Sequence, residues 1–217
     1  MLDRLSWVQK SLLVGAVLTI VWMSWSVDSL RMRVFRDTVV YIIAPLLLAV
    51  THGKHLGWRI DRRAIVSTIL LCMFVFPIYI IGSVLPTIRE FYPMWYVTPT
   101  LPSFVPHAVT LFILALAMET YFRGMLCVGV REIGFKCIFI SPVLYAMIHL
   151  DKPPIELILS GPTDALWGAV DYHANSILPS VVAHAGGLIL LDWLVLHDPV
   201  IPPELVLRAL SWVPVPL

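Results

Sequence analysis

The chain has 217 residues and a formal net charge of +1, and 59% of its residues are hydrophobic while only 13% are charged. Its mean hydropathy of +0.87 excludes an ordinary soluble domain. The near-neutral charge provides no long-range field that would attract nucleic acid. We therefore expect an integral membrane protein that is surrounded by membrane lipid and does not bind nucleic acid.

The apolar runs predict an all-α, polytopic transmembrane helical bundle of about seven spans. A span needs about 20 mostly apolar residues to cross a hydrocarbon core about 30 Å thick. In chain order, we expect helices at residues 12–27, 37–50, 64–85, 107–130, 138–150, 154–172 and 176–196. The second run is short and contains Pro45, which predicts a tilted or broken helix because proline removes a backbone donor.

Three regions follow along the chain. Residues 1–105 hold the first three predicted spans and a loop rich in proline and aromatic residues, which suits the membrane interface. Residues 106–196 hold the remaining spans and the candidate functional groups. Residues 197–217 form a Pro-rich tail. The short chain without targeting extensions predicts a multi-pass protein of a prokaryotic plasma (inner) membrane.

The segment AMETYFRG places two charges, Glu119 and Arg123, inside the fourth predicted span. An ionisable side chain at such a position costs about 3 kcal/mol or more, so it faces the interior of the bundle and marks a candidate site. The two residues lie one helical turn apart on the same face, with the acid before the base. The alternative interpretation is a structural ion pair that neutralises itself.

Two histidines lie in other apolar runs. His149 follows Tyr145 by one turn in the fifth predicted span, and His184 lies within the seventh, with Asp192 two turns later. At 1.5 Å of rise per residue, Glu119 and His149 lie about 15 to 20 Å from one membrane face and His184 about 12 Å. These depths predict that the three side chains meet near the membrane midplane. The prolines of DKPP should then end the fifth helix early.

The segments METYFRG, YAMIHL and SILPSVVAHAGG, in this order, resemble the motifs of the CPBP intramembrane proteases. This family includes the type II CAAX prenyl endopeptidases and bacteriocin-processing proteins. Its motifs are Glu-Glu-x-x-x-Arg, Phe-x-x-x-His and His-x-x-x-Asn. The residues that match are Glu119, Arg123, Gly124, Tyr145 (in place of Phe), His149 and His184. Met118 replaces the first glutamate, and Leu188 replaces the asparagine.

The resemblance implies a glutamic intramembrane endopeptidase that cleaves membrane-anchored, C-terminal sorting or CAAX-like peptides. The catalytic residues would be Glu119 as base or as its structural partner, Arg123 orienting it, His149 positioning water and His184 stabilising the oxyanion. The reaction needs no cofactor. Zinc is possible but disfavoured, since two histidines and a carboxylate can bind zinc but no HExxH motif is present.

Two alternatives stay open. Met118 and Leu188 favour a catalytically inactive CPBP relative that binds membrane helices or acts as a scaffold. A proton-coupled transporter is a further possibility, because Asp164, Asp171, Asp192 and His173 could form a proton relay. Asp164 and Asp171 could instead cap or break the sixth span.

Overall fold

The computed structural model describes residues 5–217, so the first four residues of the N-terminal region lie outside it. The described chain consists of helices joined by turns and loops, and it contains no strand. The amino-terminal half holds α1 (Trp7–Ser24), α2 (Leu30–Asp37), the π-helix η2 (Thr38–Ile43), α3 (Ala44–Thr51), α4 (Arg62–Gly82), α5 (Pro86–Phe91) and α6 (Leu101–Glu119). The second half holds the π-helix η3 (Thr120–Met125), the 3₁₀ segment η4 (Val128–Phe139), α7 (Ser141–Met147), α8 (Pro154–Ala174), α9 (Leu178–Val195) and α10 (Pro203–Ala209).

Within residues 5–217, five helical segments are long and apolar enough to cross a membrane, so the predicted count of about seven spans is not confirmed. They are Trp7–Ser24, Leu30–Thr51, Arg62–Gly82, Leu101–Met125 and Leu178–Val195. The predicted fifth span is not confirmed, because residues 138–150 comprise the end of η4, the short helix α7 and the turn after it. The predicted sixth span exists as the helix α8, which contains Glu156, Asp164 and Asp171 and is not among the candidate spans.

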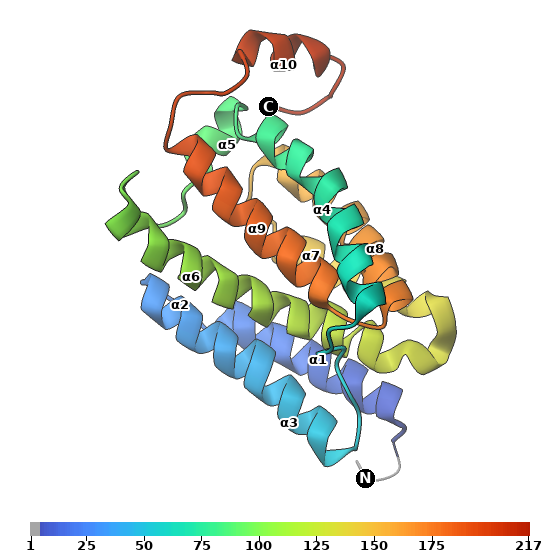
Figure 1. Ribbon diagram of the computed structural model, residues 1–217. Helices are drawn as coiled ribbons and strands as arrows, with labels where there is room; N and C mark the ends of the chain where they lie inside the picture. The colour runs from blue at the N-terminus through green and yellow to red at the C-terminus, as the bar shows by residue number, and fades with distance from the viewer. Residues whose placement is uncertain (1–4) are drawn as a thin grey trace.

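The bundle has two groups of helices that meet at α6 and α9 (Figure 1). One group comprises α1, the continuous segment α2–η2–α3, and α6, which lie side by side. The other comprises α4, α8 and α9, with α4 packed along α9. The short helices α5 and α10 lie together beyond the ends of α4 and α9. Residues from separate parts of the second half of the chain therefore converge where the two groups meet.

Apolar side chains cover the outside of the bundle, whereas charged groups lie inside it. On α4, Leu70 is 62% exposed and Met73 is 71% exposed. Glu119, Arg123 and Asp164 are each 0% exposed. This is the distribution expected when the surroundings are lipid and ionisable groups must be satisfied within the protein. The structure thus agrees with an integral membrane protein.

The ends of the long helices follow local sequence signals. Ser6 and Gln9 form a capping box that starts α1, and Asp61 accepts a hydrogen bond from the Ala64 N–H at the start of α4 (2.8 Å). Both helices therefore begin earlier than their apolar runs suggested. Asn175, with φ of 52°, ends α8 in the left-handed conformation that asparagine tolerates.

Candidate active site

A π-helical turn positions Glu119 and Arg123. The α-helix α6 ends at Glu119 and continues as η3, where the Leu126 N–H bonds to the Tyr121 carbonyl five residues earlier (3.2 Å). All six residues of η3 are buried. Single π turns inside helices occur frequently at functional sites. The widened turn allows the two charged side chains to face the middle of the bundle.

Glu119 and Arg123 belong to a chain of four buried polar side chains. The Glu119 carboxylate forms an ion pair with Arg123, with 3.0 Å between Oε2 and Nε. Arg123 also pairs with Asp164 of α8, with 3.1 Å between Nη1 and Oδ1. The Ser141 hydroxyl donates to the other Asp164 oxygen at 2.5 Å. Arg123 thus links η3 to α8, and Ser141 links α8 to α7.

Aromatic rings enclose the Arg123 guanidinium. Its Cζ lies 4.5 Å from the ring centroid of Tyr145 and 5.4 Å from that of Trp167. A cation over an aromatic face gains about 2 kcal/mol when it is desolvated. The rings and the two carboxylates therefore hold the guanidinium in one place.

His184 of α9 binds the other oxygen of Glu119. The distance from His184 Nδ1 to Glu119 Oε1 is 2.6 Å. The Trp167 ring meets the imidazole edge-on, with 5.4 Å between centroids. Because the carboxylate accepts, Nδ1 carries the hydrogen and Nε2 is left for other partners. Glu119 thereby fixes the orientation of His184 and holds a hydrogen on its Nδ1, as a carboxylate does in a hydrolytic triad.

His149 lies in the turn that follows α7. Its Nδ1 donates to the Tyr145 carbonyl (2.7 Å), since a carbonyl oxygen can only accept. Its Nε2 lies 3.7 Å from Oε1 of Glu156, in the first turn of α8. The helix α7 ends at Met147, and Pro153 and Pro154 then begin α8 as its N-cap and first residue. The helix therefore ends four residues before DKPP, where the sequence predicted its end.

A cavity of about 410 Å³ joins the two histidines. His149, His184 and Glu156 line it, together with mostly apolar side chains from α4, α8 and α9. Glu119 does not line it and is 0% exposed, but it is bonded to His184, which does line it. The structure therefore places Glu119 in direct contact with both Arg123 and His184. His149 lines the same cavity as His184.

The two positions that depart from the family motifs stay apolar. Met118 is 9% exposed and lies in the hydrophobic cluster that contains Tyr121 and Tyr145. Leu188 lines the cavity one turn beyond His184. Neither side chain can take or donate a proton.

The polar residues considered for a proton relay have separate partners. Asp192 pairs with His107 of α6 at 2.6 Å. Asp171 accepts from the Ser180 N–H (3.2 Å) and hydroxyl (2.5 Å) and so caps the first turn of α9. His173 contacts Arg63 of α4 at 2.9 Å. These pairs tie helices together, and the described structure contains no continuous relay through them.

Two residues of the site had not been assigned from the sequence. Asp164 had been considered for a relay or a helix cap, but it neutralises Arg123. Glu156 had been included in the sixth span without a role, although an acid within the apolar run PPIELIL was a signal for one. Both carboxylates lie on α8, whose packing against η3 and α7 no sequence pattern reveals.

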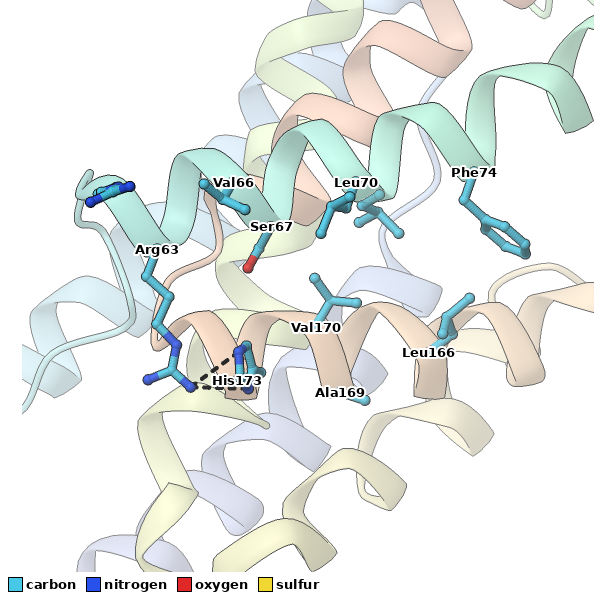
Figure 2. A pocket seen from close by; sticks show the side chains of 11 residues that line it. Arg63, Val66, Ser67, Leu70, Phe74, Leu166, Ala169, Val170 and His173 are labelled. Carbon is cyan, nitrogen blue, oxygen red and sulfur yellow. Dashed lines mark hydrogen bonds between the residues drawn. The ribbon is translucent and has the colours of Figure 1, made fainter.

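A lateral groove of about 810 Å³ runs between α4 and α8 (Figure 2). Arg63 of α4 extends across one end of the groove to His173 of α8. Apolar side chains from both helices, including Val66, Leu70 and Val170, line the rest. Phe74 and Leu166 line both the groove and the cavity with the histidines, so the two spaces are adjacent.

Comparison with known proteins agrees with this site. Residues 100–187 match the family model described as type II CAAX prenyl endopeptidase Rce1-like. The matched segment contains Glu119, Arg123, His149 and His184 and confirms the resemblance to the CPBP proteases. The inactive-scaffold alternative is not favoured by this match. No curated protein and no solved structure matches the chain.

Proposed function

We propose that the chain is a glutamic intramembrane endopeptidase. The premise is that residues 100–187 belong to the CPBP family of intramembrane proteases. It hydrolyses a peptide bond near the membrane-anchored end of its substrate. The observation that carries the proposal is the cavity lined by both His149 and His184, with Glu119 bonded behind His184. These groups supply what amide hydrolysis needs, namely a positioned water and a donor for the developing oxyanion.

His184 is the oxyanion donor in this proposal. With both carboxylates ionised, the cluster of Glu119, Arg123 and Asp164 carries one net negative charge. In its imidazolium form His184 balances that charge, bonds Glu119 through Nδ1 and presents Nε2–H to the cavity. A donor of this kind in a water-poor site is worth about 3 kcal/mol to the transition state. Glu119 and Arg123 act through His184 and are positioning residues.

The substrate is a membrane-anchored or C-terminal sorting or CAAX-like peptide. The groove between α4 and α8 supports this choice, because its apolar side chains suit a lipid chain or a hydrophobic helix arriving from the membrane. Phe74 and Leu166 mark where such a chain would reach the cavity. The expected location remains the plasma membrane of a prokaryote.

The proposal is tested by reconstituting the purified protein in liposomes with a library of membrane-anchored peptides and identifying products by mass spectrometry. Wild-type protein should cleave at least one peptide at a defined bond. His184→Ala should abolish that cleavage, whereas His197→Ala should leave it unchanged, because His197 is exposed and lies two residues beyond the end of α9. Equal cleavage by wild type and His184→Ala would contradict the proposed site.

A further inference from the structure

We propose that Glu156 is the carboxylate that activates the hydrolytic water, together with His149. The inference rests on the proposed peptidase function and names a group that the family motifs do not include. It supplies a base in a chain whose two motif positions for glutamate offer none to the cavity. Met118 occupies the place of the first glutamate of the motif, and Glu119 is sealed from the cavity by its own partners.

Glu156 has the required position. Among the described residues that line the cavity, it is the only carboxylate, and both candidate histidines line the same space. Its side chain is 25% exposed, in contrast to the 0% of Glu119 and Asp164. A general base must reach the water that it deprotonates, and Glu156 meets that requirement.

A neighbouring hydrogen-bond chain holds the Glu156 carboxylate. The Tyr92 hydroxyl lies 2.9 Å from both Oε1 and Oε2, and Lys152 Nζ donates to the Tyr92 oxygen at 2.9 Å. Burial raises the pKa of the Tyr92 phenol well above its ordinary value, so the phenol keeps its hydrogen and donates. Lys152 Nζ also lies 3.7 Å from Oε1 of Glu156. These contacts fix the carboxylate and keep a positive charge beside it.

The distance between Glu156 and His149 suits one bridging water. Their closest atoms, Oε1 and Nε2, lie 3.7 Å apart, which is too far for a direct hydrogen bond and short enough for both to contact the same water. Because His149 Nδ1 donates to the Tyr145 carbonyl, Nε2 of the neutral ring is an acceptor. A water that donates one hydrogen to each acceptor keeps its oxygen lone pairs for the substrate carbonyl.

The reaction step balances with these groups. The water oxygen forms a bond to the scissile carbonyl carbon while Glu156 accepts one water proton. The carbonyl oxygen becomes an oxyanion that accepts a hydrogen bond from His184. The C–N bond then breaks as Glu156 returns its proton to the leaving nitrogen. The products are a peptide carboxylic acid and a peptide amine, and no metal or redox partner takes part.

The alternative interpretation is that Glu156 only pairs with Lys152 and Tyr92 and stabilises the start of α8. Kinetics and stability separate the two interpretations. In the liposome assay, with the peptide that wild type cleaves, we compare Glu156→Gln with Glu132→Gln. Glu132 undergoes the same chemical change in an exposed pair with Lys54. Each variant is also examined for its melting temperature in detergent.

We expect Glu156→Gln to lower kcat by about 100-fold or more with KM little changed, which is the loss typical of a general base. Glu132→Gln should keep wild-type kcat. Glu156→Asp keeps the carboxylate on a side chain shorter by one methylene. It should retain more activity than Glu156→Gln. Tyr92→Phe, which removes a positioning contact, should lower kcat by about 10-fold, a smaller loss than that of the base.

Three different results would overturn the inference. If wild type and Glu156→Gln cleave with the same kcat while His184→Ala is inactive, the peptidase function stands and the base is another group. If wild type cleaves no peptide in the library, the peptidase function fails and the role of Glu156 fails with it. A Glu156→Gln variant whose loss of activity follows only from a lower melting temperature, and which recovers full kcat below that temperature, would assign Glu156 to structure alone.

Discussion

His184 Nδ1 lies 2.6 Å from Glu119 Oε1, and this contact joins α9 to α6 at the centre of the bundle. It explains why the membrane-embedded segment AMETYFRG carries charge. Glu119 balances Arg123 on one side and orients His184 on the other. The ion pair is therefore both a structural contact and the support of a cavity-lining histidine.

Glu119→Gln should reduce both stability and activity. The substitution leaves Arg123 fully buried with Asp164 as its remaining charged partner, and breaking a buried pair costs about 3 kcal/mol or more. Thermal unfolding in detergent measures this loss. Glu132→Gln, in an exposed pair with Lys54, should change stability by less than about 1 kcal/mol. Equal melting temperatures for the two variants would show that the Glu119–Arg123 pair does not stabilise the fold.

Gly187→Ala should weaken the contact between α4 and α9. A Cβ at this position would overlap the ring of Tyr79, which also lines the cavity, and overpacking of this kind costs about 1 to 3 kcal/mol. Gly82→Ala is the matched control, because no atom lies within 4 Å of its added Cβ. We expect a lower melting temperature for Gly187→Ala and an unchanged or slightly higher one for Gly82→Ala. The reverse order would contradict the packing of α4 on α9.

Asp61 should make the start of α4 sensitive to acid. The Ala64 N–H lowers the pKa of the Asp61 carboxyl, with a further contribution from Arg59. Because the pKa of Asp61 is lower in the folded state, its carboxylate stabilises the fold fully at pH values above the ordinary carboxyl pKa. This stabilisation disappears as the pH falls through the folded-state pKa. Wild type should therefore melt above Asp61→Ala at pH 7, and the difference should shrink in acid.

Asp61→Ser provides the control for this pH dependence. A serine hydroxyl can cap the helix without titrating, so the difference between Asp61→Ser and Asp61→Ala should persist in acid. A difference between wild type and Asp61→Ala that stays constant from pH 7 to strongly acidic pH would show that the charge of the cap is irrelevant.

Proteolysis should survive metal chelation. Within residues 5–217, no group of three or more His, Cys, Asp or Glu side chains converges as a metal site requires. We expect the same cleavage rate before and after treatment with a strong zinc chelator. Loss of activity that added zinc restores would replace the glutamic mechanism with a metal-dependent one.

The sequence predicted the class of the fold and part of the site because both depend on local signals. Hydropathy indicated all five candidate spans, but only Arg62–Gly82 and Leu178–Val195 were located to within three residues at both ends, and the start of the fourth was placed at residue 107. That helix begins earlier, at Leu101, since Pro102 in its first turn has no N–H that needs an intrahelical partner. Depth counting also predicted that Glu119 and His184 lie at similar depth.

The remaining features depend on tertiary contacts that no local pattern encodes. The π turn of η3 decides where Arg123 points, and the short α7 returns the chain so that α8 brings Asp164 to Arg123 and Glu156 to His149. Depth alone could not show that Glu119 would lie behind His184 and outside the cavity. Glu156 was missed because its partner Tyr92 is distant in sequence.

The most direct test of the central claim follows the oxygen atom of water into the product. Wild-type protein in liposomes is incubated with its membrane-anchored peptide in water enriched in oxygen-18, and the new C-terminus is analysed by mass spectrometry. We predict that this carboxylate carries one heavy oxygen atom and that its formation requires His184. A wild-type protein that yields no heavy-oxygen product from any membrane-anchored peptide would contradict the assignment of this chain as an intramembrane peptidase.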